Sequence, residues 1–426
     1  MRRRTLLAAL LLFSAVQARA DEAPPFGTPP VVTPTGPMRG MVLLFSDHGG
    51  IAEADRATAE ALGKAGVLVA EIDTDAYLAR LAEATEDCQF IVPDLELLSR
   101  QLQRAHPGAT YHTPILAGRG LGGTLAEIGL AQAWPTTIDG AVSLDPALSI
   151  GTEKPFCGDP LAARKSLQGF WSVGFTGSTA RARIEALKAA GTPVAIESAT
   201  TLEALILPHL PPATEASDVA DLPLIELPAD KPSDLLAVVL SGDGGWRDID
   251  MNLAENLRKS GVPVIGWDAL RYFWREKTPD GTAEDLAAIM QIYMAKWQAS
   301  RVALIGYSFG ADVLPFAYNR LPADLRPHVA LMALLGFANN ADFEITMGGW
   351  LGAAPSEDAL AVLPEVAKVP PGLIQCFYGS DEDDTMCPAL AAKGVEQIKT
   401  TGGHHFDGDY AALAKRILAG LRKRAG

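Results

Sequence analysis

Short, almost wholly apolar runs alternate along the chain with longer segments whose apolar residues recur at helical spacing. Runs such as LLAVVL, RVALIGY and LIQCFYG are hydrophobic on both faces of an extended segment. Strands of a parallel sheet are apolar on both faces because helices cover both sides of the sheet. Strands that alternate with helical patterns are joined by crossover helices. The pattern therefore predicts an α/β fold with a mostly parallel sheet flanked by helices.

The same order of predicted strands, turns and helices occurs twice along the chain. Residues 41–73 read MVLLFSDHGGIAEADRATAEALGKAGVLVAEID, and residues 236–268 read LAVVLSGDGGWRDIDMNLAENLRKSGVPVIGWD. Each segment predicts a buried strand, a turn ending in Gly-Gly, an amphipathic helix and a second buried strand. The two segments align without a gap, so that Ser46 falls on Ser241. We infer a tandem duplication of one α/β unit.

The first twenty residues, 1–20, have the composition of a secretory signal peptide. Three arginines precede an apolar stretch of about half a membrane-spanning length, and Ala18-Arg19-Ala20 supplies a small-x-small cleavage site. We therefore expect cleavage before Asp21 and a mature protein in the periplasm. The alternative is a membrane anchor that is retained.

Two proline-rich stretches divide the remaining chain. A chain of 426 residues fits two domains of roughly 200 residues each. Residues 21–38 are expected to form a flexible leader and residues 210–234 a linker between domains. The predicted domains are then 39–209 and 235–426.

Charge and cysteine content restrict the function further. The net charge of −15 disfavours nucleic acid as a partner, because phosphate binding needs a basic surface, and favours a cationic or zwitterionic ligand. Export permits disulfides. Pairing Cys88 with Cys157 and Cys376 with Cys387 is the simplest arrangement, because each bond then stays within one half. No cysteine or histidine spacing is typical of a zinc site. We expect neither a metal nor a cofactor.

A nucleophile motif, GYSFG at residues 306–310, lies in the second half between a predicted strand and a predicted helix. G-x-S-x-G in that context forms the nucleophile elbow of α/β-hydrolases, a sharp turn that exposes the serine hydroxyl. Serine becomes a good nucleophile only when an imidazole takes its proton and a carboxylate orients that imidazole. We therefore predict Ser308 as the nucleophile of a Ser-Asp-His triad.

The acid and the base should follow the serine in that order. The strand LIQCFYG opens into the run DEDD, and the sequence GGHHF comes after one more predicted strand. We favour Asp384 as the acid, with Asp383 as the alternative, and His405 as the base, with His404 as the alternative. An acidic run that is only a solvated surface loop is the competing interpretation.

An oxyanion hole needs two backbone N–H groups that point at the developing negative charge. One is expected from Phe309, which follows the nucleophile. The other is expected from Asp243 in the turn SGDGGW, where Gly242 lets the backbone approach the substrate. The competing interpretation of SGDGGW is a tight turn without a catalytic role.

The first half is predicted to contain the same strand–turn–helix arrangement, but without a nucleophile. In LAGRGLGG, Gly120 stands at the position of Ser308. Aligning FTGS with FYGS sets Gly177 on Gly379 and puts Arg181 and Ala182 where the acid candidates lie, and no histidine occupies the third position. We therefore expect the first domain to be a degenerate, catalytically inactive copy, kept for stability, substrate capture or partner binding.

Four motifs of the second half together resemble the VirJ/AcvB family of bacterial periplasmic virulence proteins. They are GYSFGADVLPFAYNRLP, SGDGGW, YGSDEDDTMCP and GGHHFDGDY, spread over about 190 residues. The two-domain length resembles AcvB-type members. The resemblance implies a tandem α/β-hydrolase fold, and a serine hydrolase that cleaves lysine from lysyl-phosphatidylglycerol at the membrane surface, supporting lipid homeostasis and virulence. It also implies components of a type IV secretion system as possible partners.

The charge pattern agrees with the substrate that this resemblance implies. The lysyl headgroup is dicationic, and Asp243, Asp248, Asp250 and the run 381–384 should attract it. Two other functions remain open, namely a general periplasmic esterase or peptidase and a binding or assembly factor without catalytic activity.

Overall fold

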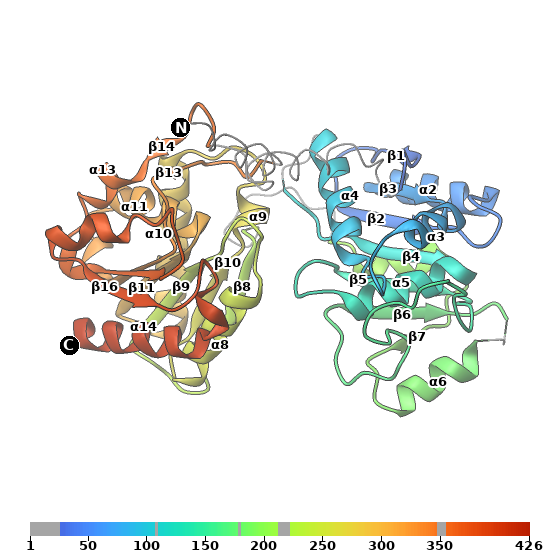
Figure 1. The fold of residues 1–426 in the computed structure, drawn as a ribbon. Helices are drawn as coiled ribbons and strands as arrows, with labels where there is room; N and C mark the ends of the chain where they lie inside the picture. The colour runs from blue at the N-terminus through green and yellow to red at the C-terminus, as the bar shows by residue number, and fades with distance from the viewer. Residues whose placement is uncertain (1–25, 107–109, 178–179, 212–221, 347–354) are drawn as a thin grey trace, which may run out of the picture. The chain divides into compact units, whose positions relative to one another are not determined.

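The computed structural model of the chain describes five ranges of residues. They are 26–106, 110–177, 180–211, 222–346 and 355–426 (Figure 1). The predicted signal peptide, the start of the leader and residues 212–221 of the predicted linker lie outside these ranges. Within the described ranges, no helix is long and apolar enough to cross a membrane.

The chain divides into two compact units. The first unit ends at Pro211, and the second comprises residues 212–426 together with the short segments 103–112 and 134–136. Each unit contains its own seven-stranded sheet.

The sheet of the first unit has the order β1-β3-β2-β4-β5-β6-β7, in which β1 is antiparallel and the other strands are parallel. Its strands are β1 (Val31–Val32), β2 (Gly40–Phe45), β3 (Val67–Ile72), β4 (Ile115–Arg119), β5 (Gly140–Leu144), β6 (Phe170–Gly174) and β7 (Ala195–Ile196). The main helices that connect them are α2 (Glu53–Lys64), α3 (Thr74–Glu83), α4 (Val92–Ala105), α5 (Gly120–Gln132), α6 (Arg181–Ala189) and α7 (Leu202–Ile206).

The sheet of the second unit has the order β16-β15-β12-β11-β9-β10-β8, in which β8 is antiparallel. Its strands are β8 (Leu224–Leu227), β9 (Leu235–Leu240), β10 (Val264–Trp267), β11 (Arg301–Tyr307), β12 (Val329–Leu335), β15 (Ile374–Gly379) and β16 (Glu396–Thr400). Its helices include α8 (Asp248–Lys259), α9 (Ala269–Tyr272), α10 (Pro279–Trp297), α11 (Phe309–Arg320), α13 (Val362–Val366) and α14 (Tyr410–Ala425), with the 3₁₀ segment η5 (Cys387–Lys393).

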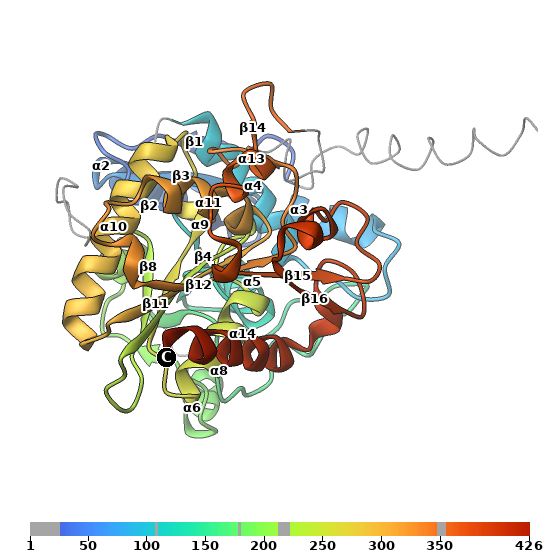
Figure 2. The ribbon, with the colours of Figure 1, turned by 90° about the vertical axis from the view of Figure 1, so that its left-hand side faces the viewer.

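The two sheets have the same topology. Counting the strands of each sheet in chain order gives 1-3-2-4-5-6-7 in both, with the first strand antiparallel. In the second unit, α8 and α14 cover one face of the sheet, and α10 and α11 cover the other (Figures 1 and 2). The predicted fold class, two mostly parallel sheets flanked by helices, is confirmed.

Strand β9 shows why the sequence folds in this way. Leu236, Val238 and Leu240 pack in the core beneath α10 and α11, whereas Ala237 and Val239 pack in the core beneath α8 and α14. Successive side chains of a strand point to opposite faces, so a strand covered on both faces is apolar at every position. Strand β2 alternates in the same way between the two cores of the first unit.

Each unit carries one disulfide. The bonds join Cys88 to Cys157 and Cys376 to Cys387. The predicted pairing within each half is therefore confirmed, and no described cysteine is free.

The sheet register changes one predicted correspondence between the copies. Leu144 of β5 and Leu335 of β12 are equivalent, because they pair with the residues that precede Gly120 and Ser308. On the other side, Leu144 pairs with Gly174, whereas Leu335 pairs with Phe377. Two residues beyond these partners lie Thr176 and Gly379. Thr176, rather than Gly177, is therefore the structural counterpart of Gly379. The sequence alignment of FTGS with FYGS differs from the register of the two sheets by one residue.

Candidate active site

Ser308 occupies a sharp turn between β11 and α11. Its backbone has φ 50° and ψ −120°, a conformation that non-glycine residues seldom adopt and that nucleophile elbows require. A Cβ atom at Gly306 would lie 2.5 Å from the carbonyl oxygen of Gly310, and one at Gly310 would lie 2.3 Å from that of Leu240. Both glycines of the motif are needed because backbone passes where their side chains would be.

Two other segments flank the serine. The Ser308 N–H donates to the carbonyl oxygen of Leu335 at the end of β12, with a distance of 2.8 Å. On the other side, a Cβ atom at Gly242 would lie only 3.6 Å from the Ser308 Cβ. The turn after β9 and the end of β12 therefore border the half-buried Ser308.

A histidine and a glutamate form a hydrogen-bonded pair in this region, a candidate acid–base pair. His404 Nδ1 lies 2.6 Å from Glu382 Oε1, and only 7% of the Glu382 side chain is exposed. The other oxygen, Oε2, accepts the Gly379 N–H at 3.1 Å. Glu382 is therefore held at both oxygens. Contact through Nδ1 leaves His404 Nε2 for the nucleophile, as in Ser-His-Asp triads.

The pair lies next to the elbow. The rings of His404 and Tyr307 have centroids 5.2 Å apart. A Cβ atom at Gly336, the residue after Leu335, would lie 2.8 Å from His404 Cε1 and 3.0 Å from Glu382 Oε1. His404 thus contacts Tyr307, which precedes Ser308, and Gly336, which follows Leu335.

The favoured acid and base of the sequence lie elsewhere. Asp383 and Asp384 are exposed, and no described residue is hydrogen-bonded to their side chains. His405 is exposed as well, and its Nδ1 lies 3.2 Å from the Tyr307 hydroxyl. The structure instead brings together His404, the alternative base, and Glu382, a member of the acidic run for which the sequence predicts no catalytic role.

The reason is the path of the loop after β15. The chain turns back at Ser380, so that Glu382 caps the N–H group of Gly379, three residues earlier. The two aspartates that follow then point outward. Four consecutive acidic residues carry no signal of which one faces inward, because a turn decides it. The glutamate in the run is distinguished by its longer side chain alone.

The two predicted oxyanion donors flank the serine as well. Phe309 opens α11, where the first N–H groups have no partner within the helix and the helix dipole is positive. Asp243 lies in the turn closed by the bond from the Gly245 N–H to the Gly242 carbonyl, 3.1 Å. No described acceptor receives the N–H of Phe309 or that of Asp243. Both groups are therefore available to a ligand.

Several carboxyl groups lie near the elbow. Asp312 lies one turn after Ser308, and burial raises the pKa of its carboxyl well above the usual range. The hydrogen bond from the Ala338 N–H, 2.7 Å long, lowers this pKa, whereas the nearby Asp243 raises it further. Burial also raises the pKa of the Tyr307 hydroxyl, as does the charge of Asp250. The described residues include no group of three or more His, Cys, Asp or Glu placed to hold a metal ion.

One acid predicted to attract a cationic ligand cannot do so. Asp250 is 2% exposed, and its Oδ2 accepts the Arg247 N–H at 3.3 Å at the start of α8. It serves the helix terminus, as its counterpart Asp55 does in the first unit. Asp248 is exposed and Asp243 half-buried, so these two remain able to meet a ligand.

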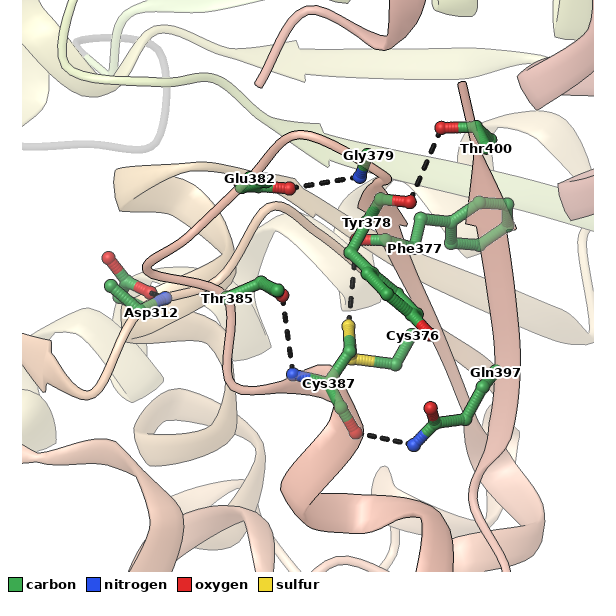
Figure 3. The surroundings of a disulfide bond; sticks show 11 residues. Asp312, Cys376, Phe377, Tyr378, Gly379, Glu382, Thr385, Cys387, Gln397 and Thr400 are labelled. Carbon is green, nitrogen blue, oxygen red and sulfur yellow. Dashed lines mark hydrogen bonds between the residues drawn. A yellow bond between two sulfur atoms is a disulfide. The ribbon is translucent and has the colours of Figure 1, made fainter. Parts of the chain in front are cut away.

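The second disulfide holds the loop that carries Glu382 (Figure 3). Cys376 belongs to β15 and Cys387 begins η5, and both are fully buried. The Cys387 N–H donates to Thr385 Oγ1 at 3.3 Å, and its carbonyl accepts from the Gln397 amide of β16. The loop between the cysteines is therefore attached to the sheet at both ends.

Comparisons with known proteins extend these observations. A family model described as "Bacterial virulence protein (VirJ)" matches residues 234–425. A comparison with curated protein sequences found no match. The solved structures that resemble the chain include an esterase of Pyrococcus furiosus, with 14% identity and a TM-score of 0.35 over 51% of this chain and 99% of that one.

Two further structures have similar values. Est1E from Butyrivibrio proteoclasticus, solved with ferulic acid bound, has 11% identity and a TM-score of 0.34 over 48% of this chain and 95% of its own. A lidless α/β serine hydrolase from Xanthomonas campestris has 15% identity and a TM-score of 0.31 over 47% and 87%. The expected resemblance is confirmed for the half of the chain that carries the motifs. Residues 234–425 therefore match the VirJ family, and they lie in the unit whose seven-stranded, mostly parallel sheet is flanked by helices.

Proposed function

We propose that the second unit is a serine esterase whose nucleophile is Ser308. His404 is the general base, Glu382 orients it, and the N–H groups of Asp243 and Phe309 form the oxyanion hole. One observation carries the proposal: the hydrogen-bonded His404–Glu382 pair contacts the segments on both sides of a strained serine elbow.

The reaction follows from these positions. Ser308 Oγ attacks the ester carbonyl carbon while its proton passes to His404 Nε2, and Glu382 stabilises the imidazolium through Nδ1. The carbonyl oxygen becomes an oxyanion between the two N–H groups. Collapse expels the alcohol, which takes the proton from His404. A water molecule, deprotonated by His404, then releases the acid and restores Ser308.

The proposed substrate is lysyl-phosphatidylglycerol, which this reaction would split into lysine and phosphatidylglycerol, supporting membrane lipid homeostasis and virulence. Its aminoacyl ester is open to serine attack, and its headgroup is cationic. A chain of net charge −15 with exposed Asp248, Asp383 and Asp384 on the second unit suits a cation. The substrate and the periplasmic location rest on the family and on the signal-like N-terminus.

The same site supports a second candidate function. The elbow, the His404–Glu382 pair and the two N–H groups would act on any accessible ester, so a general periplasmic esterase or peptidase is the alternative enzyme. A non-catalytic binding or assembly factor for a type IV secretion system is the third possibility, for which the catalytic residues would be dispensable.

Incubation of the full-length protein with mixed vesicles distinguishes the three. We expect lysyl-phosphatidylglycerol to disappear and free lysine to form in equal amounts, by chromatography of lipid and aqueous phases. The variant Ser308→Ala should abolish both while retaining its circular dichroism spectrum. Cleavage of p-nitrophenyl acetate with intact lysyl lipid would favour the general esterase. Activity that survives in Ser308→Ala would remove the serine mechanism.

A further inference from the structure

The first unit keeps the elbow although it has no nucleophile. Gly120 has φ 48°, against 50° for Ser308. A Cβ atom at Gly122, or at its counterpart Gly310, would lie 2.3 Å from the carbonyl oxygen that ends β2 or β9, respectively. The backbone of the vestigial site therefore repeats the backbone of the other site closely enough for its N–H groups to be compared one by one.

A carboxylate of the chain itself fills the vestigial oxyanion hole. Asp47 Oδ1 accepts the N–H of Leu121 at 2.8 Å and the N–H of His48 at 2.9 Å. By position in the duplicated turns, Leu121 corresponds to Phe309 and His48 to Asp243. The two amides that bind Asp47 are therefore the counterparts of the Phe309 and Asp243 amides, for which the described residues of the second unit supply no acceptor.

Asp47 also takes the place of the missing serine side chain. A Cβ atom at Gly120 would lie 2.2 Å from Asp47 Oδ2, far inside van der Waals contact. The residue at the position of Asp47 in the second unit is Gly242, which has no side chain. A Cβ atom there would meet the Tyr307 ring at 3.3 Å and Ser308 Cβ at 3.6 Å.

A second carboxylate replaces the acid–base pair. Asp145 stands at the position of Gly336 and shares its left-handed backbone, with φ 46° against 62°. Asp145 accepts the N–H of Thr176 at 3.0 Å. The counterpart of that amide, Gly379, donates to Glu382 instead.

The Asp145 carboxylate is firmly held. Burial raises the pKa of Asp145, but hydrogen bonds from the Thr176 side chain and backbone and from the Gly177 N–H, 3.0 Å away, outweigh burial and keep the pKa below its usual value. It therefore stays ionised at neutral pH. In the first unit, Asp47 and Asp145 therefore occupy the positions that correspond to Ser308 and to the His404–Glu382 pair of the second unit.

We propose that the first unit is a hydrolase fold closed from within, in which Asp47 acts as a built-in carboxylate ligand of the oxyanion hole and Asp145 replaces the acid–base pair. Gly242 is then the residue that leaves the equivalent hole of the second unit open to an external oxyanion. Removal of the Asp47 side chain creates a site for a small carboxylate such as acetate, and because Asp47 is exposed this site opens to solvent.

An acetate titration of the full-length protein tests the first unit directly. In the variant Asp47→Gly, the backbone amide resonances of His48 and Leu121 should shift saturably with acetate, by transverse relaxation-optimised NMR. The wild-type protein at matched ionic strength should show no shift. Unmoved resonances in the variant, or equal shifts in both proteins, would overturn the proposal. This outcome does not depend on any enzymatic activity.

The reciprocal exchange tests the second unit, and this part rests on the proposed function. The variant Gly242→Asp should slow labelling of Ser308 by a fluorophosphonate about 100-fold or more, as loss of an oxyanion donor does. The matched variant Gly242→Ala adds Cβ alone, which would meet the Tyr307 ring at 3.3 Å, and should lose much less reactivity than Gly242→Asp. Equal rates for the two variants would contradict closure by a carboxylate. A wild-type protein that takes no label would count against the esterase, while the acetate result would stand.

Discussion

The two units of this chain have one topology and one elbow but differ in what occupies it. Both fix the turn after the first parallel strand in the same way: Ser46 Oγ accepts the Thr74 N–H at 3.1 Å, and Ser241 Oγ accepts the Ala269 N–H at 2.9 Å. The second unit adds a serine and an oriented histidine, whereas the first fills the same places with carboxylates. The comparison shows that the backbone of a nucleophile elbow can persist without its nucleophile.

Residues without side chains account for much of this difference. Gly242 and Gly336 leave room beside Ser308 and beside the His404–Glu382 pair. Their counterparts in the first unit are Asp47 and Asp145. Absence of a side chain is therefore as much a part of the proposed site as the side chains that react.

The largest expected effect concerns the two adjacent histidines. The variant His404→Ala should lower kcat of ester hydrolysis about 10⁶-fold, because a serine without its base loses nearly all activity. The control His405→Ala should remain within about tenfold, since His405 is exposed and bonded to Tyr307. Steady-state kinetics on a soluble ester measures both. The reverse ranking would restore His405 as the base and refute the pair described above.

The acidic run gives the next effect. The variant Glu382→Gln keeps the shape but lets the histidine take the wrong tautomer, and should lower kcat about 10⁴-fold. Asp384→Asn alters an exposed side chain and should change kcat less than about threefold. The same assay with both variants compares the candidates. Loss of activity in Asp384→Asn alone would assign the acid to Asp384 and contradict the role of Glu382.

A smaller effect is expected from Gly336. The variant Gly336→Ala should lower kcat/KM about 100-fold, because its Cβ atom would displace His404 and Glu382 by an ångström or so. Gly394→Ala is the control: Gly394 also has a left-handed backbone, φ 81°, but a Cβ atom there meets nothing within 4 Å. If both variants lose activity equally, backbone strain rather than the collision would be responsible.

The disulfides should separate stability from activity. Loop-closure entropy assigns about 3 kcal/mol to the bond across 11 residues and about 4 kcal/mol to the bond across 69. Replacing Cys376 and Cys387 by serine should destabilise the second unit and lower activity about tenfold, because the loop of Glu382 loses an anchor. Replacing Cys88 and Cys157 should destabilise the first unit and leave turnover unchanged. Urea unfolding and the ester assay measure both, and an inactive Cys88 and Cys157 variant that remains folded would mean that the first unit contributes to catalysis.

The sequence predicted the features that local chemistry decides. Apolar runs such as LLAVVL identified strands buried on both faces, the G-x-S-x-G motif located the elbow, and the cysteine positions indicated the pairing. Each of these depends on backbone conformation or on hydrophobic period, which neighbouring residues largely fix.

Side-chain direction was beyond what the sequence could supply. Whether Glu382 or Asp384 faces inward depends on a turn against Gly379, and Asp250 looks like a surface acid until the start of α8 is seen to bury it. The closure of the first unit by Asp47 needed coordinates too, because its partner Leu121 lies 74 residues away in the chain. These contacts are set by tertiary packing.

We propose that one of the two units carries a working serine nucleophile. Treating the full-length protein with a fluorophosphonate and mapping the adduct by peptide mass spectrometry tests it without choosing a substrate. We expect one adduct, on Ser308, which disappears in Ser308→Ala. An unmodified Ser308, or an adduct on a serine of the first unit, would contradict it.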